Sequence, residues 1–260
     1  MTKILAIANQ KGGVGKTTTS VNLAASLAAA QRRVLLIDLD PQGNATTGSG
    51  VNKSELTTTV YHVLLGSHAL RDVRVSVQQG GYDIIPANRE LAGAEVELVD
   101  QVQREQRLRQ ALQDIVEEYD YILIDCPPAL SLLTLNGLVA AQSVMIPMQC
   151  EYYALEGLSD LVNTVKKVRA NLNPELEIEG LLRTMFDPRN ALAQQVSDQL
   201  QSHFGDKVYS TVIPRNIRLA EAPSYGLPVL FYDRASKGAL AYIALAGEFL
   251  QRREGAAVLA

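Results

Sequence analysis

The chain has 260 residues, of which 47% are hydrophobic and 20% charged, and its formal net charge is −4. A chain of this length can bury a large core unaided, and its cysteines, Cys126 and Cys150, form no C-x-x-C pair, so we expect neither a disulfide framework nor a zinc site. No signal peptide fits the N-terminus and no apolar run has membrane-spanning length, so we expect one cytoplasmic α/β domain over residues 1–260.

Short apolar runs alternate with longer helical patterns along the chain, which predicts a mostly parallel, twisted sheet flanked by helices in a three-layer sandwich. The expected strands cover residues 3–8, 33–37, 121–124, 143–147, 179–184 and 208–213. The expected helices cover residues 16–30, 98–118, 131–140, 154–170 and 236–252. The small polar stretch at 43–50 predicts a mobile loop, and we expect a frayed tail over 255–260.

Charge is unevenly distributed along the chain. Residues 80–130 hold eleven acidic and four basic side chains, whereas residues 205–260 hold five acidic and seven basic ones. This pattern is compatible with a local basic face on an acidic protein, and equally with ordinary variation on a solvated surface.

A phosphate-binding loop follows the first expected strand. The stretch NQKGGVGKTTT, residues 9–19, fits the pattern G-x-x-x-x-G-K-[ST] with Gly15, Lys16 and Thr17 in the last three places. Gln10 stands where the first glycine belongs, and a second lysine, Lys11, follows it. The strand before the loop and the helix after it give the motif the context that it needs.

The residue types in this loop suit a nucleotide phosphate. Glycines let the backbone curl so that its N–H groups point at phosphate oxygens, and the helix start adds its positive dipole end. We expect Lys16 to reach the β- and γ-phosphates and the Thr17 hydroxyl to ligate Mg²⁺.

Carboxylates follow two other expected strands. Asp125 ends the run YILID, and Asp38 and Asp40 end the run LLIDLD. Ligands of open α/β sheets bind where parallel strands end, so we expect Asp125 to serve Mg²⁺ and the other two aspartates to have different roles. Taken alone, each of these aspartates also fits a residue that caps a helix or a turn.

Lys11 is the unusual member of the loop. Two lysines of one chain on the same phosphates would repel each other, so Lys11 either points at the phosphates of a second subunit or is simply exposed to solvent. A cation supplied in trans stabilises transition-state charge as an arginine finger does.

Several stretches resemble one family. KGGVGKTT is similar to the deviant Walker A loop of the ParA/MinD ATPases, and DLDPQGNAT and YILIDCPP resemble the two switch segments of that family. IPRNIRLAEAPSYGLPV, residues 213–229, resembles the short chromosomal ParA (Soj) branch. The resemblance implies a P-loop NTPase fold and a slow, Mg²⁺-dependent hydrolysis of ATP to ADP and phosphate.

The resemblance also assigns roles to residues. It implies that Lys11 acts in trans, that Lys16 is catalytic, that Asp40 positions the attacking water, and that Thr17, Asp40 and Asp125 serve Mg²⁺. The implied nucleotide-binding residues are Gly12, Gly13, Val14, Gly15, Lys16, Thr17, Thr18, Met185, Pro214, Arg215 and Asn216.

The implied activity is DNA partitioning. In the family, ATP drives formation of a sandwich homodimer that binds double-stranded DNA without sequence preference, and a ParB-type centromere-binding partner stimulates hydrolysis and release. The implied location is the nucleoid. Candidate DNA contacts are Arg189, Arg215, Arg218 and Lys237, unless the arginines are surface residues paired with Asp187, Glu221 and Asp233. Only eight residues precede the loop segment, so we expect no N-terminal helix-turn-helix domain.

Three other classes share this loop. A MinD-like membrane-cycling ATPase is the main alternative, but the small C-terminal residues disfavour a lipid-docking helix, so we expect no stable membrane association. A nitrogenase-iron-protein-like redox ATPase needs two cysteine ligands from each subunit, and Cys150 is a poor partner for Cys126. A tyrosine kinase on this loop would carry a C-terminal tyrosine cluster, and no tyrosine follows Tyr242.

Overall fold

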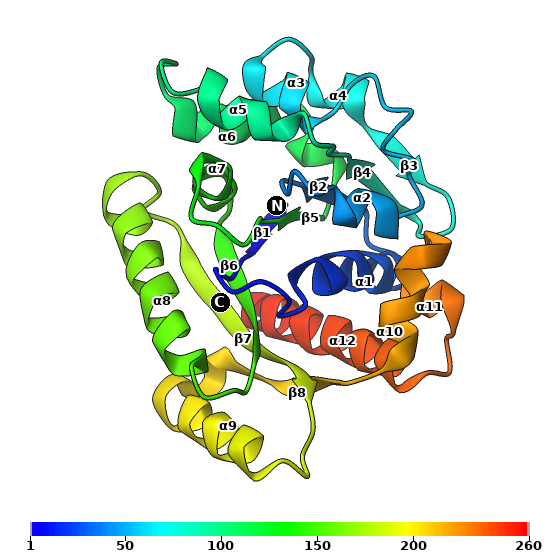
Figure 1. The fold of residues 1–260 in the computed structure, drawn as a ribbon, viewed down its shortest axis with the longest axis vertical. Coiled ribbons are helices and arrows are strands. Elements are labelled where there is room, and N and C mark those ends of the chain that lie inside the picture. The colour runs from blue at the N-terminus through cyan, green and yellow to red at the C-terminus, as the bar shows by residue number, and fades with distance from the viewer. Residues whose placement is uncertain (1, 259–260) are drawn as a thin grey trace.

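An eight-stranded sheet lies between two layers of helices in the computed structural model, which describes residues 2–258 (Figure 1). The spatial order is β3-β4-β2-β5-β1-β6-β7-β8, and only the β3–β4 pair is antiparallel. The strands are β1 (Lys3–Ile7), β2 (Val34–Asp38), β3 (Val75–Val77), β4 (Tyr82–Ile85), β5 (Tyr121–Asp125), β6 (Ser143–Gln149), β7 (Glu177–Phe186) and β8 (Val208–Pro214).

The helices divide between the two faces of the sheet (Figure 1). One face carries α3 (Val60–Leu65), α4 (Leu70–Val73), α5 (Leu91–Glu97), α6 (Arg107–Leu112), α7 (Leu132–Ala140), α8 (Ala154–Asn171) and α9 (Ala191–Phe204). The other carries α1 (Lys16–Ala29), α10 (Ile217–Glu221), α11 (Val229–Tyr232) and α12 (Lys237–Val258). The short helix α2 (Asn44–Gly48) follows β2.

The apolar strand sequences fill both layers because successive side chains point to opposite faces. In β1, Leu5 and Ile7 pack beneath α1 and α12, whereas Ala6 belongs to the core under α7 and α8. Both cores are therefore built from the same short apolar runs, and the expected mostly parallel, helix-flanked sheet is confirmed.

The six strands expected from the sequence are present with small shifts of their ends, as are four of the five expected helices. The sequence did not predict the edge strand β3, its neighbour β4, or the helices α2, α3, α4, α5, α9, α10 and α11. Helix α12 continues to Val258, and residues 259–260 of the tail expected to fray lie outside the described residues.

The expectation of one helix over residues 98–118 is wrong. Regular α-helix covers only α6, with 3₁₀ turns at Arg104–Gln106 and Val116–Glu118. Gln103 has a φ of 55°, which a right-handed helix cannot accommodate. The Asn136 side chain of α7 also bonds the main chain here, donating to the Arg104 carbonyl and accepting from the Leu108 amide. Contacts with α7 therefore override the local pattern.

The stretch 43–50, expected to be a loop, contains the helix α2. Thr46 in this helix donates its amide and its hydroxyl to Asp38 Oδ2, at 2.8 and 2.7 Å. Both bonds join α2 to the end of β2, so long-range polar contacts fix a stretch whose composition favours disorder.

The strand register gathers the expected site residues at one edge of the sheet. Asp125 is the register partner of Ile7 on one side and of Asp38 on the other. The loop after β1 and the carboxylates of β2 and β5 therefore meet at the carboxyl edge, where open α/β sheets bind ligands.

Candidate functional site

The loop between β1 and α1 forms a curled segment whose shape depends on glycine. Gly13 and Gly15 have φ angles of 72° and 86°, which side chains with a Cβ rarely adopt. Gly15 precedes the first residue of α1, so the loop delivers the free N–H groups of the helix start to the same place. Asn9 fixes the loop entrance by donating to the Pro147 carbonyl and accepting from the Lys11 amide. This is the backbone cradle that an anionic phosphate requires.

Lys16 is nearly buried within this cradle, with 6% of its surface exposed. Its Nζ donates to the main-chain oxygen of Lys11 at 3.0 Å. Burial lowers the pKa of Lys16, and the charges of Asp125 and Asp40 oppose that shift. A buried ammonium beside carboxylates at the mouth of a glycine loop is suited to hold phosphate oxygens.

Asp125, at the end of β5, connects helix α1 to the sheet. It is fully buried, and it accepts hydrogen bonds from the hydroxyls of Thr17 and Ser20, each at 2.8 Å. Burial is the larger cause and the charge of Asp38 the next in raising the pKa of Asp125 to about 8. The sequence singled out Thr17 and Asp125 separately, and the structure brings them into contact.

Asp38 and Asp40 have different surroundings. Asp38 is fully buried and bonded to Thr46, and burial raises its pKa to about 6. Asp40 lies beyond the strand end, where its Oδ1 accepts from the Gln42 amide at 2.9 Å. Asp38 thus anchors the segment after β2, and Asp40 lies in the turn that this segment forms.

The donor set fits a magnesium ion. The charges of Asp38 and Asp40 act on Asp125, and those of Asp125 and Asp40 act on Lys16. The Thr17 hydroxyl held by Asp125 is a hard oxygen ligand beside these carboxyl groups. No cluster of three His, Cys, Asp or Glu side chains suited to a metal exists among the described residues, so the ion would need further oxygens from a nucleotide or water.

A cavity of about 420 Å³ opens beside the loop, between β7, β8 and α10. Gly15 and Thr18 line its loop side. The other side is lined by Met185, Pro214, Arg215 and Asn216, which the resemblance implied as nucleotide-binding, and by Ile213 and Ile217, which were not predicted. An apolar pocket with a few polar groups next to a phosphate cradle is suited to a nucleoside.

Lys11 lies at the outer rim of the loop. Its Nζ is 2.5 Å from Oε2 of Glu151, a residue that follows β6, and its side chain is 48% exposed. Lys11 therefore does not reach into its own phosphate cradle, which agrees with both alternatives left open by the sequence.

The four candidate DNA contacts are exposed at the surface. Arg189 pairs with Asp187, and Arg218 pairs with Glu221 and Asp233, as the surface-pairing alternative expects. Arg215 lines the pocket rim, and Lys237 begins α12. Side chains that are 88% and 45% exposed, as in Arg189 and Arg218, remain available to a polyanion.

Several residues of the site belong to no motif and were not predicted. Ser20 shares Asp125 with Thr17, and Thr184 Oγ1 donates to the Val14 carbonyl at 2.7 Å. Gln149 Nε2 reaches the Gly13 carbonyl at 3.3 Å. A polar residue at the carboxyl end of a strand was the available clue for Thr184 and Gln149, since ligands gather there.

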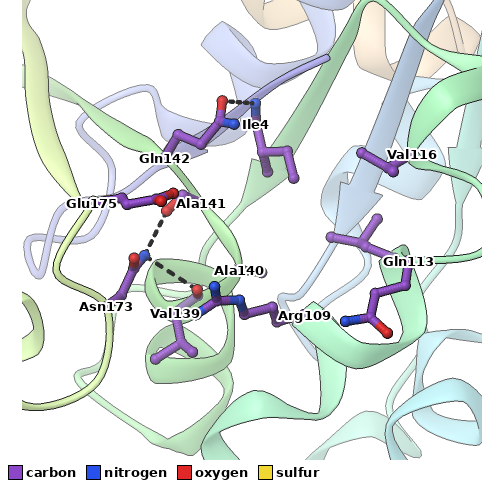
Figure 2. Close-up of a pocket in the computed structure, with 11 residues that line it drawn as sticks. Ile4, Arg109, Gln113, Val116, Val139, Ala140, Ala141, Gln142, Asn173 and Glu175 are labelled. Atoms are coloured by element: carbon purple, nitrogen blue, oxygen red, sulfur yellow. Dashed lines mark hydrogen bonds between the residues drawn. The ribbon is translucent and has the colours of Figure 1, made fainter. Parts of the chain in front are cut away.

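A second cavity, of about 180 Å³, lies at the opposite edge of the sheet (Figure 2). Ile4 and Gln142, near the starts of β1 and β6, form one side, and Asn173 donates to the carbonyls of Val139 and Ala141. It contains none of the predicted site residues.

The redox and membrane alternatives gain no support from the structure. Cys126 and Cys150 are both buried, and burial raises the pKa of each thiol, the second to about 11. Phe249 of α12 is fully buried in the core, and Arg253 at the same end pairs with Glu179. Among the described residues, no helix is long and apolar enough to cross a membrane.

Comparison with known proteins gives consistent relatives. A family model described as an AAA domain matches residues 2–178. The chain is 56% identical to the sporulation initiation inhibitor protein Soj of Bacillus subtilis, over 95% of this chain and 98% of that protein. It is 52% identical to the chromosome partitioning protein ParA of Caulobacter vibrioides (strain NA1000 / CB15N), over 96% and 94%.

Among solved structures, a Mycobacterium smegmatis protein described as cobyrinic acid a,c-diamide synthase, with a bound ATP analogue and magnesium, matches with a TM-score of 0.86. It is 38% identical and covers 98% of this chain and 96% of its own.

Proposed function

The chain belongs to the ParA/Soj family of chromosome-partitioning ATPases, and from that premise we propose that it moves DNA by an ATP-driven cycle of dimerisation and DNA binding. The observation that carries the proposal is that the phosphate site of one subunit has a second lysine at its rim that does not reach into it. Lys16, Thr17 and Asp125 converge in the site, and Lys11 lies outside it at the rim.

The reaction is hydrolysis of ATP to ADP and phosphate, with Mg²⁺ as cofactor. The loop amides and Lys16 bind the phosphates, and Thr18, Met185, Pro214 and Asn216 surround the nucleoside in the adjoining cavity. Thr17 would hold the ion, and Asp125 orients the Thr17 hydroxyl. The ion would supply positive charge that offsets the negative charge of the phosphate oxygens.

Asp40 is the residue that orients the attacking water. It is near the phosphate cradle, since its charge acts on Lys16, and it lies just past the end of β2 rather than within the strand. Asp38 holds α2 to the end of β2 through Thr46, which fixes the far end of the turn that carries Asp40.

Dimerisation completes the site. Lys11 is half-exposed at the rim, so a second copy facing the loop would receive its ammonium on the bound triphosphate. That cation adds to Lys16 in stabilising the charge that develops on the transferred phosphoryl group. A single subunit then binds ATP without hydrolysing it efficiently.

DNA binding follows from charge. Arg215, Arg218, Arg189 and Lys237 are exposed side chains, and a dimer presents each of them twice. Affinity for DNA rises steeply with the number of phosphates contacted, so doubling a modest basic surface converts weak binding into retention on the nucleoid. A ParB-type partner, bound at a centromere-like site, stimulates hydrolysis and thereby releases the dimer.

The membrane-cycling alternative requires an apolar helix face that lipid can reach. Phe249 and Arg253 of α12 are both engaged with the body of the protein, which favours partitioning over that alternative. Binding to plasmid DNA of arbitrary sequence tests the proposal, measured with ATP, ADP and no nucleotide over a salt series. ATP-dependent, salt-sensitive binding supports it; strong ATP-dependent sedimentation with anionic liposomes and no DNA binding contradicts it.

A further inference from the structure

Lys11 is held by an acidic partner within its own subunit. Its ammonium contacts Glu151 at 2.5 Å, although the two residues are 140 positions apart. The side chains are 48% and 45% exposed, so the pair lies at the surface rather than in the core. A lysine whose role lies in a neighbouring subunit is thus occupied before the neighbour arrives.

The surroundings of Glu151 mark an open face. The next two residues, Tyr152 and Tyr153, are 74% and 69% exposed. Their rings pack edge to face, with the ring centroids 5.0 Å apart. Large exposed aromatic side chains are typical of surfaces that meet another protein. The ion pair therefore lies beside a surface suited to a second copy of the chain.

The main chain of Lys11 is also engaged. Its carbonyl accepts the Lys16 ammonium at 3.0 Å, and its amide donates to Asn9 Oδ1 at 3.0 Å. A phosphate that drew Lys16 to itself would take that partner from the Lys11 carbonyl.

We propose that Glu151 is a positioning residue that holds Lys11 in cis and so sets the threshold for dimerisation. The proposal rests on the trans role of Lys11 in the proposed function. For a dimer to form, each Lys11 must leave Glu151 for the phosphates of the opposite subunit. A triphosphate competes with one carboxylate better than a diphosphate does because it carries more charge, so the pair favours ATP over ADP as the nucleotide that assembles the dimer.

The size of the effect follows from the exposure of the pair. Exposed ion pairs shift an equilibrium by up to about fivefold. Two such pairs break for each dimer, so removing both should tighten the dimer by up to about 25-fold. An effect of this size tunes assembly without making it independent of nucleotide.

The test compares Glu151→Gln, which removes the charge and keeps the shape, with the wild-type chain. The dimer dissociation constant is measured by analytical ultracentrifugation with Mg²⁺ and AMPPNP, and again with Mg²⁺ and ADP. Glu156→Gln is the matched control because Glu156 is an exposed carboxylate in the first turn of α8. Thermal unfolding of each variant shows whether it is folded.

We expect Glu151→Gln to tighten the AMPPNP dimer by roughly 3- to 25-fold and to strengthen association with ADP, with Glu156→Gln unchanged. Glu151→Asp, which keeps the charge but shortens the reach, should fall between. An unchanged or weaker dimer in Glu151→Gln overturns the proposal. Lys11→Ala separates the two proposals. If Lys11→Ala dimerises normally, the trans role of Lys11 is wrong. If Lys11→Ala fails to dimerise but Glu151→Gln has no effect, only the role of Glu151 is wrong.

Discussion

The ammonium of Lys16 lies 3.0 Å from the main-chain oxygen of Lys11, five residues earlier in the loop. The ligand-free loop therefore satisfies its own buried cation, as a buried charge requires. A nucleotide must replace that bond with bonds from phosphate oxygens. In the ligand-free loop, the side chain of Lys16 is thus hydrogen-bonded to the backbone of Lys11.

Lys16→Ala should weaken ATP binding strongly. The variant loses charge-assisted hydrogen bonds worth about 1.5–3 kcal/mol, or roughly 10- to 150-fold in affinity. Titration with a fluorescent ATP analogue measures the change. Lys166→Ala, an exposed lysine on α8, is the control and should bind normally. Wild-type affinity in Lys16→Ala would remove this lysine from the site.

Asp40→Ala should separate assembly from hydrolysis. Loss of a residue that orients the water should lower the hydrolysis rate by about 100-fold or more. The variant should still bind ATP, form the dimer and bind DNA. Phosphate release and DNA retention are measured on the same sample. Asp72→Ala, an exposed residue of α4, should behave as wild type. Full turnover in Asp40→Ala would exclude Asp40 from the mechanism.

Arg218→Glu should prevent DNA binding and leave the ATP dimer intact. Its ion pairs with Glu221 and Asp233 are at the surface, so stability should change by less than about 1 kcal/mol. Because the dimer presents Arg218 twice, the slope of log affinity against log salt should fall by about 2 in any residual binding. Arg33→Glu is the control because it reverses an ion-paired arginine, just before β2, whose side chain is 61% exposed. Unchanged DNA retention in Arg218→Glu would contradict the assignment.

Thr46→Val should destabilise the protein through Asp38. Thr46 Oγ1 donates to the buried Asp38 and accepts from the Ala87 amide, and valine can do neither. An unsatisfied buried group costs about 1–3 kcal/mol. Denaturant unfolding of Thr46→Val measures the loss, with the exposed Thr57→Val as control.

The loss in Thr46→Val should depend on pH. The Thr46 hydrogen bond favours the ionised form of Asp38, whose pKa burial raises to about 6. The carboxyl ionises as the pH rises through that value, so the cost of losing the hydroxyl should be larger at pH 8 than at pH 5. An equal loss at both would show that Thr46 does not stabilise the charge of Asp38.

Local patterns predicted the sheet and the phosphate loop because both depend on short stretches of sequence. The β1 run and Gly15-Lys16-Thr17 each carry their structure in a few adjacent residues. The helix expected over 98–118 failed because Asn136, from a different helix, bonds its main chain. The helix α2 was missed because its hydrogen bonds to Asp38 come from the fold and not from helix propensity.

The same distinction holds within the site. The sequence identified Thr17 and Asp125 by type and position, but only the register of β1 with β5 brings the end of β5 beside the loop. The Lys11–Glu151 pair had no local signal, since it depends on where β6 ends relative to the loop. Contacts between residues far apart in the sequence could not be predicted from local motifs.

We infer that Lys11 makes the site incomplete until a second copy arrives. The most direct test is sedimentation of wild-type chain and Lys11→Ala with Mg²⁺ and ATP, alongside nucleotide affinity and hydrolysis rate. We expect Lys11→Ala to bind ATP with near wild-type affinity, to stay monomeric and not to hydrolyse ATP above background. A Lys11→Ala chain that forms an ATP dimer and turns over normally would contradict this role of Lys11.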